Sequence, residues 1–266
     1  MIYVVPSLKA KEKLQCEGKA WAESQGFTYV PRGKRTIQDL MDEYGEDFLV
    51  YSSRGPQIDR PEGSHFFSLN MAELRIQNLR KGQRDHLLEA LMGRGSSKLP
   101  ITVLDCTCGF GADAAVASFG LPTGSRVDAL EVSPLLEAVT SWGFSHFVHK
   151  KDDVTAALRR ISLRRGDYRD YLLSDEGPVY DVLYFDPMFQ RPVEASCQFQ
   201  PVRAIMEHGG LTRDLIERAL QKARRRVVIK ERDFRQLCRD FPEAVLYGGK
   251  YSRIGYAVLE CDSWKK

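Results

Sequence analysis

Short apolar runs alternate with amphipathic stretches near the start of the chain. The apolar runs have the length of strands, and the stretches between them have the spacing of helices. The elements expected in chain order are a strand at 2–5, a helix at 9–24, a strand at 27–30, a helix at 36–44 and a strand at 48–51. Prolines and glycines at 54–63 interrupt this pattern and indicate a linker. We therefore expect a small N-terminal α/β subdomain over 1–62 and a larger domain over 63–266.

The larger domain begins with helical spacing at 71–92 and continues as a regular alternation of strands and helices. Strands are expected at 101–104, 126–130, 161–164, 179–185, 226–230, 244–247 and 255–260. Helices are expected at 112–119, 135–147, 211–223 and 234–239. This order predicts a mostly parallel sheet with helices on both faces. Only a short connection that includes residues 248–253 separates the last two strands, and it holds no crossover helix, so these strands must be antiparallel.

The composition is that of a globular protein. Hydrophobic residues make up 43% and charged residues 28% of the 266 residues, which is enough apolar material for a sizeable core. No apolar run approaches the roughly 20 residues that cross a bilayer, and residues 1–6 lack the pattern of a secretory signal. We expect a cytoplasmic protein without a membrane span. Cys106 and Cys108 are spaced too tightly for a zinc knuckle, and no metal site is expected.

Basic residues gather in short clusters although the formal net charge is only +3. The clusters are Lys150-Lys151, Arg159-Arg160, Arg164-Arg165, residues 224–226, and Lys250 with Arg253. Such clusters favour a phosphate backbone as a partner. Solvated helix faces and strand ends are the alternative interpretation of each single cluster.

The first strand of the larger domain runs into a glycine-rich turn. The turn reads Asp105-Cys106-Thr107-Cys108-Gly109-Phe110-Gly111-Ala112-Asp113. In open α/β sheets ligands bind beyond the carboxyl ends of the strands, and glycines let the backbone lie close to a bound nucleoside. Gly109 and Gly111 are therefore candidate nucleoside contacts. Asp105 lies where the ammonium group of a methionine-containing donor would need a counter-charge.

Acidic residues also follow the second and third strands. Glu131 lies 22 residues past Gly109, where a carboxylate can accept hydrogen bonds from both ribose hydroxyls of an adenosine. Asp167 could bond the adenine amine, and Tyr168 could lie on the adenine ring. A solvated strand end at Glu131 and an ordinary turn at Asp167 are the alternatives.

The glycine turn also matches the dinucleotide pattern G-x-G-x-x-A over residues 109–114. A nicotinamide-dependent oxidoreductase is therefore an alternative function. It requires a nearby Lys, Tyr or His as proton donor, and the sequence identifies none. A non-catalytic RNA-binding protein on the same scaffold is a second alternative.

The fourth strand ends in Asp186-Pro187-Met188-Phe189. An exocyclic base amine is a poor nucleophile because its lone pair is delocalised into the ring. A carboxylate and a backbone carbonyl that accept its two hydrogens would pull the nitrogen toward tetrahedral geometry and aim the lone pair at a methyl group. We predict that Asp186 and the Pro187 carbonyl are these acceptors and that Phe189 stacks on the base. An Asp-Pro turn with a core phenylalanine is the alternative. Lys230 ends the fifth strand near the proposed acceptor and is interpreted as a solvated strand end.

Together these motifs resemble those of class I methyltransferases. Asp-Pro-Met-Phe at 186–189, Gly-Ala-Asp at 111–113 and Arg-Val-Val-Ile-Lys at 226–230 are similar to the ribosomal RNA small subunit methyltransferase J family and its uncharacterised relatives. The resemblance covers about residues 65–260. It implies a Rossmann-like, seven-stranded, mostly parallel sheet with its last strand antiparallel, S-adenosylmethionine as donor, and the 2-amino group of a guanine in small-subunit rRNA as acceptor.

The resemblance also implies which residues contact the donor. They are Ala112, Asp113, Glu131, Val132, Asp167, Tyr168 and Asp186. The sequence departs from the named family at Ala112 and Val132, where that family carries basic residues. We expect a class I methyltransferase that uses S-adenosylmethionine and acts on a nucleobase amine of RNA, with small-subunit rRNA or a ribosomal particle as partner.

Overall fold

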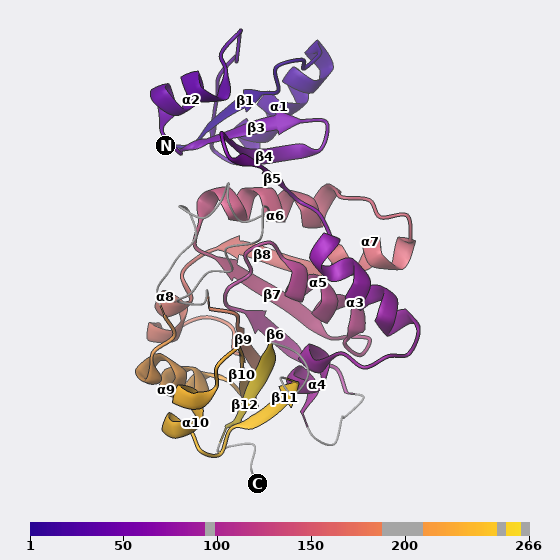
Figure 1. The fold of residues 1–266 in the computed structure, drawn as a ribbon, viewed down its shortest axis with the longest axis vertical. Coiled ribbons are helices and arrows are strands. Elements are labelled where there is room, and N and C mark those ends of the chain that lie inside the picture. Colours follow the sequence, from indigo (N-terminus) through magenta and orange to yellow (C-terminus); the bar gives the residue numbers. More distant parts are fainter. Residues whose placement is uncertain (94–98, 188–209, 249–253, 262–266) are drawn as a thin grey trace. The chain divides into compact units, whose positions relative to one another are not determined.

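The computed structural model describes residues 1–93, 99–187, 210–248 and 254–261, and these form two compact units (Figure 1). The smaller unit contains Met1–Ser68 together with Ser133–Phe147. The larger unit contains the other described residues. Within the described ranges, no helix is both long and apolar enough to pass through a membrane.

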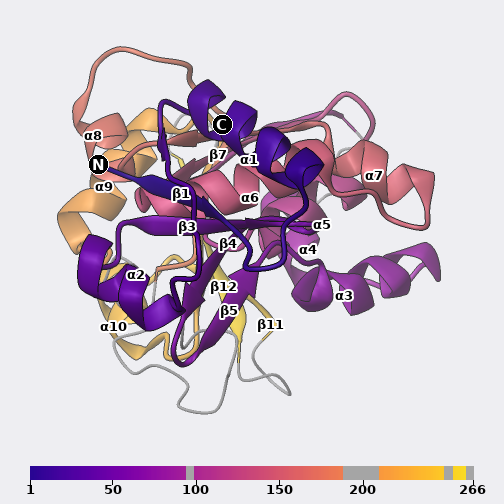
Figure 2. The same cartoon turned by 90° about the horizontal axis from the view of Figure 1, so that it is seen from above.

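The smaller unit is built on a five-stranded sheet in the order β2-β1-β3-β4-β5. Its strands are β1 (Tyr3–Pro6), β2 (Thr28–Tyr29), β3 (Phe48–Ser52), β4 (Gly55–Arg60) and β5 (Gly63–Phe66). Its helices are α1 (Glu12–Ser24), α2 (Ile37–Tyr44) and α6 (Pro134–His146). Figure 2 shows α1 and α2 on opposite sides of β1 and β3. Thr36 and Asp39 form a capping box that begins α2, whose Leu40 packs on Val5 and Phe48.

The linker expected at 54–63 is instead a hairpin. Strands β4 and β5 pair antiparallel, and β4 also pairs with β3. Gly55 adopts a φ of +87°, and a Cβ at this position would lie 2.5 Å from the Trp142 ring of α6. Glycine is therefore used here for a turn and a close approach rather than for a flexible connection. The expected boundary after residue 62 falls between the two paired strands, and the division into 1–62 and 63–266 stays a prediction.

The larger unit contains a seven-stranded sheet in the order β11-β12-β10-β9-β6-β7-β8. Its strands are β6 (Thr102–Asp105), β7 (Arg126–Glu131), β8 (Ile161–Arg165), β9 (Val182–Phe185), β10 (Arg226–Glu231), β11 (Val245–Gly248) and β12 (Gly255–Glu260). Neighbouring strands from β10 to β8 are parallel, and β12 is antiparallel to both of its neighbours. The predicted Rossmann-like sheet is confirmed. The carboxyl ends of β6, β7, β8 and β9 therefore share one edge.

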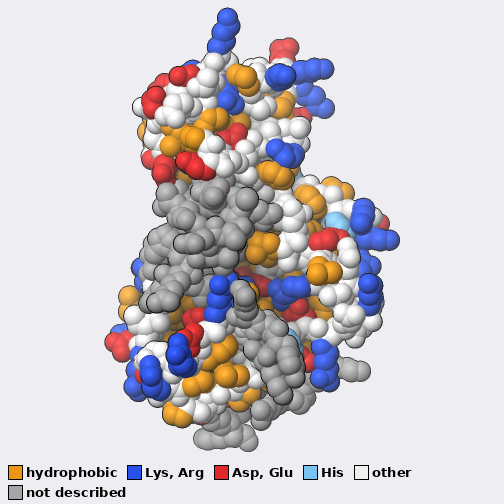
Figure 3. All heavy atoms as spheres, viewed as in Figure 1, with side chains coloured by type: hydrophobic (Ala, Val, Ile, Leu, Met, Phe, Trp, Pro, Cys, Tyr) orange, Lys and Arg blue, Asp and Glu red, His pale blue; other side chains and the backbone are white. Residues whose placement is uncertain are grey.

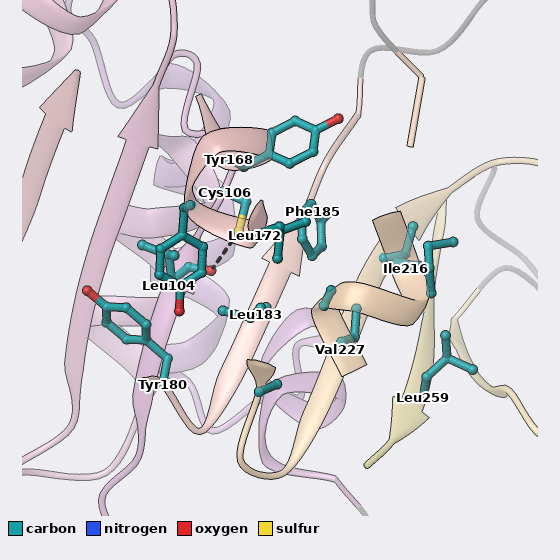
Figure 4. Packing of buried hydrophobic residues seen from close by; sticks show 14 of the residues in the cluster. Leu104, Cys106, Tyr168, Leu172, Tyr180, Leu183, Phe185, Ile216, Val227 and Leu259 are labelled. Carbon is teal, nitrogen blue, oxygen red and sulfur yellow. Dashed lines mark hydrogen bonds between the residues drawn. The ribbon is translucent and has the colours of Figure 1, made fainter. Parts of the chain in front are cut away.

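Helices cover both faces of this sheet. Helices α3 (Asn70–Arg80), α4 (His86–Met92), α5 (Ala112–Gly120) and α7 (Asp152–Leu158) pack together on one face. The opposite face of the sheet is covered by helices α8 (Tyr168–Leu173), α9 (Arg213–Lys222) and α10 (Arg235–Asp240). Figure 4 shows the apolar cluster beneath α8 and α9, to which alternate strand residues contribute. These strand residues are Leu104, Leu130, Leu183, Phe185, Val227, Ile229 and Leu259.

Strand alternation directs the intervening residues to the face of α3, α4 and α5. Asp105, Tyr184 and Lys230 occupy these positions, next to the residues that pack under α8 and α9. The Tyr184 hydroxyl donates to Asp113 of α5, which confirms this direction. The sheet thus has one apolar face and, near the carboxyl ends of its central strands, a charged opposite face.

Candidate active site

The glycine turn links β6 to α5 in a left-handed conformation. Gly109 and Gly111 have φ values of +52° and +74°. A Cβ at Gly109 would meet Thr107 O at 4.0 Å and no closer described atom, so the space beside this backbone is open. Among the described side chains none caps the first turn of α5. The turn therefore leaves room for a ligand to approach the backbone.

Glu131 is tied directly to this turn. The backbone N–H of Gly109 donates to Glu131 Oε2 at 2.8 Å. Glu131 ends β7 and is only 7% exposed. The structure thus brings together Gly109 and Glu131, which the sequence predicts as parts of one nucleoside site. The Glu131 carboxylate lies at the carboxyl edge of the sheet, and its Oε2 binds the glycine turn. Val132, the next residue, is 36% exposed.

Asp167 and Tyr168 follow β8 and begin α8. Asp167 Oδ1 accepts a hydrogen bond from the Arg169 backbone N–H at 2.8 Å and so acts as the N-cap. The Tyr168 ring packs edge-on against Phe185, with ring centroids 5.4 Å apart (Figure 4). Its hydroxyl is buried and finds no hydrogen-bond partner among the described atoms. The adenine contacts expected of both residues stay predictions.

Asp186 directly follows β9 and is fixed to the glycine turn through its backbone. Its N–H donates to Thr107 Oγ1 at 2.7 Å. Its carboxylate Oδ2 lies 2.6 Å from Lys230 Nζ, and its side chain is 30% exposed. Pro187 follows and is half-buried. Met188 and Phe189 lie outside the described residues, so the stacking role expected of Phe189 stays a prediction.

Lys230 is the partly buried centre of two ion pairs, and its interpretation as a solvated strand end is wrong. Its side chain is 14% exposed, and Nζ lies 2.8 Å from Asp113 Oδ2 as well as 2.6 Å from Asp186 Oδ2. The reason is the alternation of β10, which points Lys230 away from the apolar cluster and toward α5. Asp113, expected to contact the donor, is bonded instead to Lys230, Arg75 and Tyr184 in the structure, and donor contact stays a prediction for it.

Arg75 of α3 extends this ion network. It donates to Asp113 Oδ1 and makes a two-point contact with Asp85, with distances of 2.7 and 2.8 Å. Asp85 also accepts backbone N–H groups at the start of α4. We define the charged chain as Asp85, Arg75, Asp113, Lys230 and Asp186. In Figure 3 acidic and basic side chains lie side by side on the visible face of the larger unit.

Asp105, Asp113 and Asp186 differ in how their surroundings shift the pKa of the carboxyl group. Burial raises the pKa of Asp105 well above its usual value, and the nearby carboxylates add to this effect. Burial would also raise the pKa of Asp113, but the charges of Lys230 and Arg75 hold it below its usual range. For Asp186, burial prevails over the opposing charge of Lys230 and raises the pKa to about 6. The carboxyl group of Asp186 therefore titrates close to the physiological pH range.

Sequence reasoning missed Lys230, Arg75, Asp85, Tyr184 and Thr107. A signal was present for two of them, because Tyr184 and Lys230 occupy alternate positions in otherwise apolar strands, where a polar residue needs a buried partner. Arg75 and Asp85 carry no such signal, since their spacing along the chain does not reveal that α3 and α4 meet α5.

A family model described as "Putative SAM-dependent methyltransferase" matches residues 64–255 of the chain. Uncharacterized protein YpiP of Bacillus subtilis is 29% identical over 230 residues, which cover 86% of this chain and 88% of that protein. Ribosomal RNA small subunit methyltransferase J of Dechloromonas aromatica is 28% identical over 195 residues, which cover 72% of this chain and 76% of that protein.

Among solved structures, a SAM-dependent methyltransferase from Neisseria gonorrhoeae has the same fold. Its TM-score is 0.62, and the superposition covers 98% of this chain and 96% of that one at 17% sequence identity. The match therefore extends over both units and shows the fold alone.

Proposed function

The chain belongs to the SAM-dependent methyltransferase family, and from this premise we propose that it methylates an exocyclic amine of a nucleobase, namely the 2-amino group of a guanine in small-subunit rRNA. Its donor is S-adenosylmethionine. The observation that carries the proposal is the position of Asp186. This carboxylate follows β9 and is tethered through Thr107 to the turn expected to hold the donor.

The residues around the glycine turn fit the donor. Open space beside Gly109 suits a nucleoside lying against the backbone, and Glu131 at the end of β7 suits ribose hydroxyls. Asp105 is buried behind the turn with a raised pKa, and a bound ammonium group would favour its ionised form. When bound, S-adenosylmethionine supplies an electrophilic methyl group.

Asp186 and Pro187 prepare the acceptor amine. The Asp186 carboxylate and the Pro187 carbonyl accept its two hydrogens, which draws the nitrogen lone pair out of conjugation and orients it. With both reactants held in line, the nitrogen would gain the methyl group and lose one of its two protons to the Asp186 carboxylate that accepts that hydrogen, without a covalent enzyme intermediate. A guanine within an RNA helix would have to be turned out of the stack to reach these groups.

The choice of RNA rests on two observations. Relatives that are 28 to 30% identical to this chain over the aligned residues are named ribosomal RNA small subunit methyltransferase J, and basic residues are exposed at the sheet edge and beside α7. The exposed ones include Lys150, Lys151, Arg159, Arg160, Arg164 and Arg165. These residues would contact phosphates around the target base. The family assignment favours a methyltransferase over a nicotinamide-dependent oxidoreductase. A methyl transfer assay is needed to distinguish a methyltransferase from a non-catalytic RNA-binding protein on the same scaffold.

The test is transfer of a labelled methyl group to small ribosomal subunits from a strain that lacks this protein. We expect the wild-type protein to label the rRNA and Asp186→Asn to lose about 100-fold in kcat, because the amide holds the amine in the wrong geometry. Asp214→Asn, at an exposed position in the first turn of α9, is the matched control and should retain activity. Absence of label in RNA with the wild-type protein would contradict the proposal.

A further inference from the structure

Lys230 stands between two carboxylates that belong to different elements. Its ammonium group lies 2.6 Å from Asp186, which follows β9, and 2.8 Å from Asp113 in the first turn of α5. It is the bridge between the glycine-turn helix and the proposed acceptor site. A lysine so placed determines where the Asp186 carboxylate can lie, because any rotation of that carboxylate away from Nζ breaks a short charged contact.

Asp113 is itself held by the protein. Oδ1 accepts from Arg75, and Oδ2 accepts from both Tyr184 and Lys230. Arg75 is in turn fixed by its two-point contact with Asp85. The Lys230 ammonium group therefore has a rigid partner on the side away from Asp186, and helix α3 contributes to the position of a group at the end of β9.

We infer that Lys230 is a positioning residue that fixes the Asp186 carboxylate for methyl transfer, and that Arg75 and Asp113 hold Lys230 in place. This inference rests on the proposed role of Asp186 as acceptor of the amine hydrogens. In this inference Asp113 acts by holding Lys230, and helix α3 contributes Arg75, which holds Asp113.

Removal of the ammonium group has a consequence for charge as well as for geometry. The charged and titratable groups that act on Asp186 are Lys230, Asp113 and Glu231, and its partners are acted on by Arg75, Asp105, Tyr184 and Tyr256. Among the described residues, Lys230 is the cation in contact with Asp186. A neutral side chain at position 230 therefore leaves Asp186 beside the Asp113 charge without that cation. The pKa of Asp186 should then rise further, because a nearby like charge and burial both disfavour the ionised form.

The experiment compares Lys230→Met, Lys230→Arg and Arg75→Gln with Lys222→Met as matched control. Lys222 is also a half-buried lysine of the larger unit, but its ammonium contacts backbone carbonyls of Tyr171 and Ser174. We expect Lys230→Met to lower kcat about 100-fold and to move the acid limb of the kcat–pH profile upward by about one pH unit, with little change in donor affinity by calorimetry. Lys230→Arg should restore the acid limb, since it keeps the charge.

A purely structural role for Lys230 predicts a different result. Lys230→Met would then keep the kcat and the acid limb of Lys222→Met, and the inference would be overturned. If Lys230→Met does not fold, Arg75→Gln tests the same charged chain with Lys230 in place. This variant should also have a lower kcat, and an unchanged kcat would contradict the inference.

Failure of the proposed function is visible separately. If the wild-type protein transfers no methyl group to rRNA, carboxylate NMR of Asp186 across pH still compares the wild-type protein with the Lys230 variants and needs no acceptor. A raised pKa in Lys230→Met that Lys230→Arg reverses would support the positioning role, whereas an identical titration in all variants would refute it.

Discussion

Three aspartates near the carboxyl edge of the sheet, Asp105, Asp113 and Asp186, differ in the charged groups beside them. Asp113 faces two cations and is held ionised, whereas burial dominates at Asp105 and raises its pKa. Asp186 lies between these cases, since it has one cation, Lys230, and a carboxylate, Asp113, close by. Each side chain thus has its chemistry set by residues from other elements rather than by its own motif.

The first prediction at this scale concerns pH. The pKa of Asp186 is raised to about 6, and only the ionised carboxylate accepts the amine hydrogens. Activity should therefore be present above this pKa and be lost as the pH falls through it, with about a tenth of the activity left one pH unit below. A kcat–pH profile measured at saturating donor checks this. An acid limb near the ordinary aspartate value would contradict the role given to Asp186.

The sequence could predict candidate site residues at strand ends. It could not predict the contacts that these residues make with side chains distant along the chain. Glu131, Gly109 and Asp186 follow from the rule that ligands lie beyond the carboxyl ends of parallel strands. Lys230 is also at a strand end, but its burial depends on Asp113 and Asp186, which are distant along the chain. Arg75 depends on the packing of α3 on α5, and nothing local to its helix indicates that contact.

At the scale of elements, the glycine turn connects β6 to α5 and also binds residues at the ends of β7 and β9. Its left-handed glycines redirect the chain from β6 into α5, and the Gly109 N–H bonds to Glu131 at the end of β7. The Thr107 hydroxyl in the same turn accepts the N–H of Asp186 after β9. Three neighbouring strand ends are therefore held in a fixed relation by a single loop.

The second prediction tests this turn. Gly109→Ala should cost about 1 kcal/mol of stability, because an alanine at positive φ is strained, and it should weaken S-adenosylmethionine binding further, because the methyl group enters the open space beside the turn. Gly177→Ala is the matched control, since Gly177 also has a positive φ and open surroundings but lies in the loop after α8. Calorimetry with the donor should show a loss at position 109 alone. Equal donor affinity in the two variants would argue against a donor site at Gly109.

Most elements of the larger unit could be predicted from periodicity, because its strands and helices are amphipathic or apolar in regular order. The hairpin of β4 and β5 could not. Its glycines and prolines have the local pattern of a linker, and only the pairing with β3 and the contact of Gly55 with Trp142 explain them. The sequence predicts a helix at 135–147 but not its partner, and the structure packs α6 on β4.

At the scale of the whole molecule, the seven-stranded sheet has the Rossmann-like order expected from the sequence, and the family assignment shows S-adenosylmethionine as the methyl donor. The smaller unit accounts for the described residues before α3 together with α6. Helices α1, α2 and α6 pack on its sheet. The identity of the methyl acceptor stays a proposal.

The central claim is that Asp186 directs methyl transfer onto a base amine of small-subunit rRNA. The most direct measurement is mass spectrometric mapping of small-subunit rRNA from cells with the wild-type protein, with Asp186→Asn, and without the protein. The account predicts one guanine that carries a methyl group on its 2-amino nitrogen in the first case and is unmethylated in the other two. Identical rRNA in all three, or a methyl group on a ribose or a ring carbon, would contradict it.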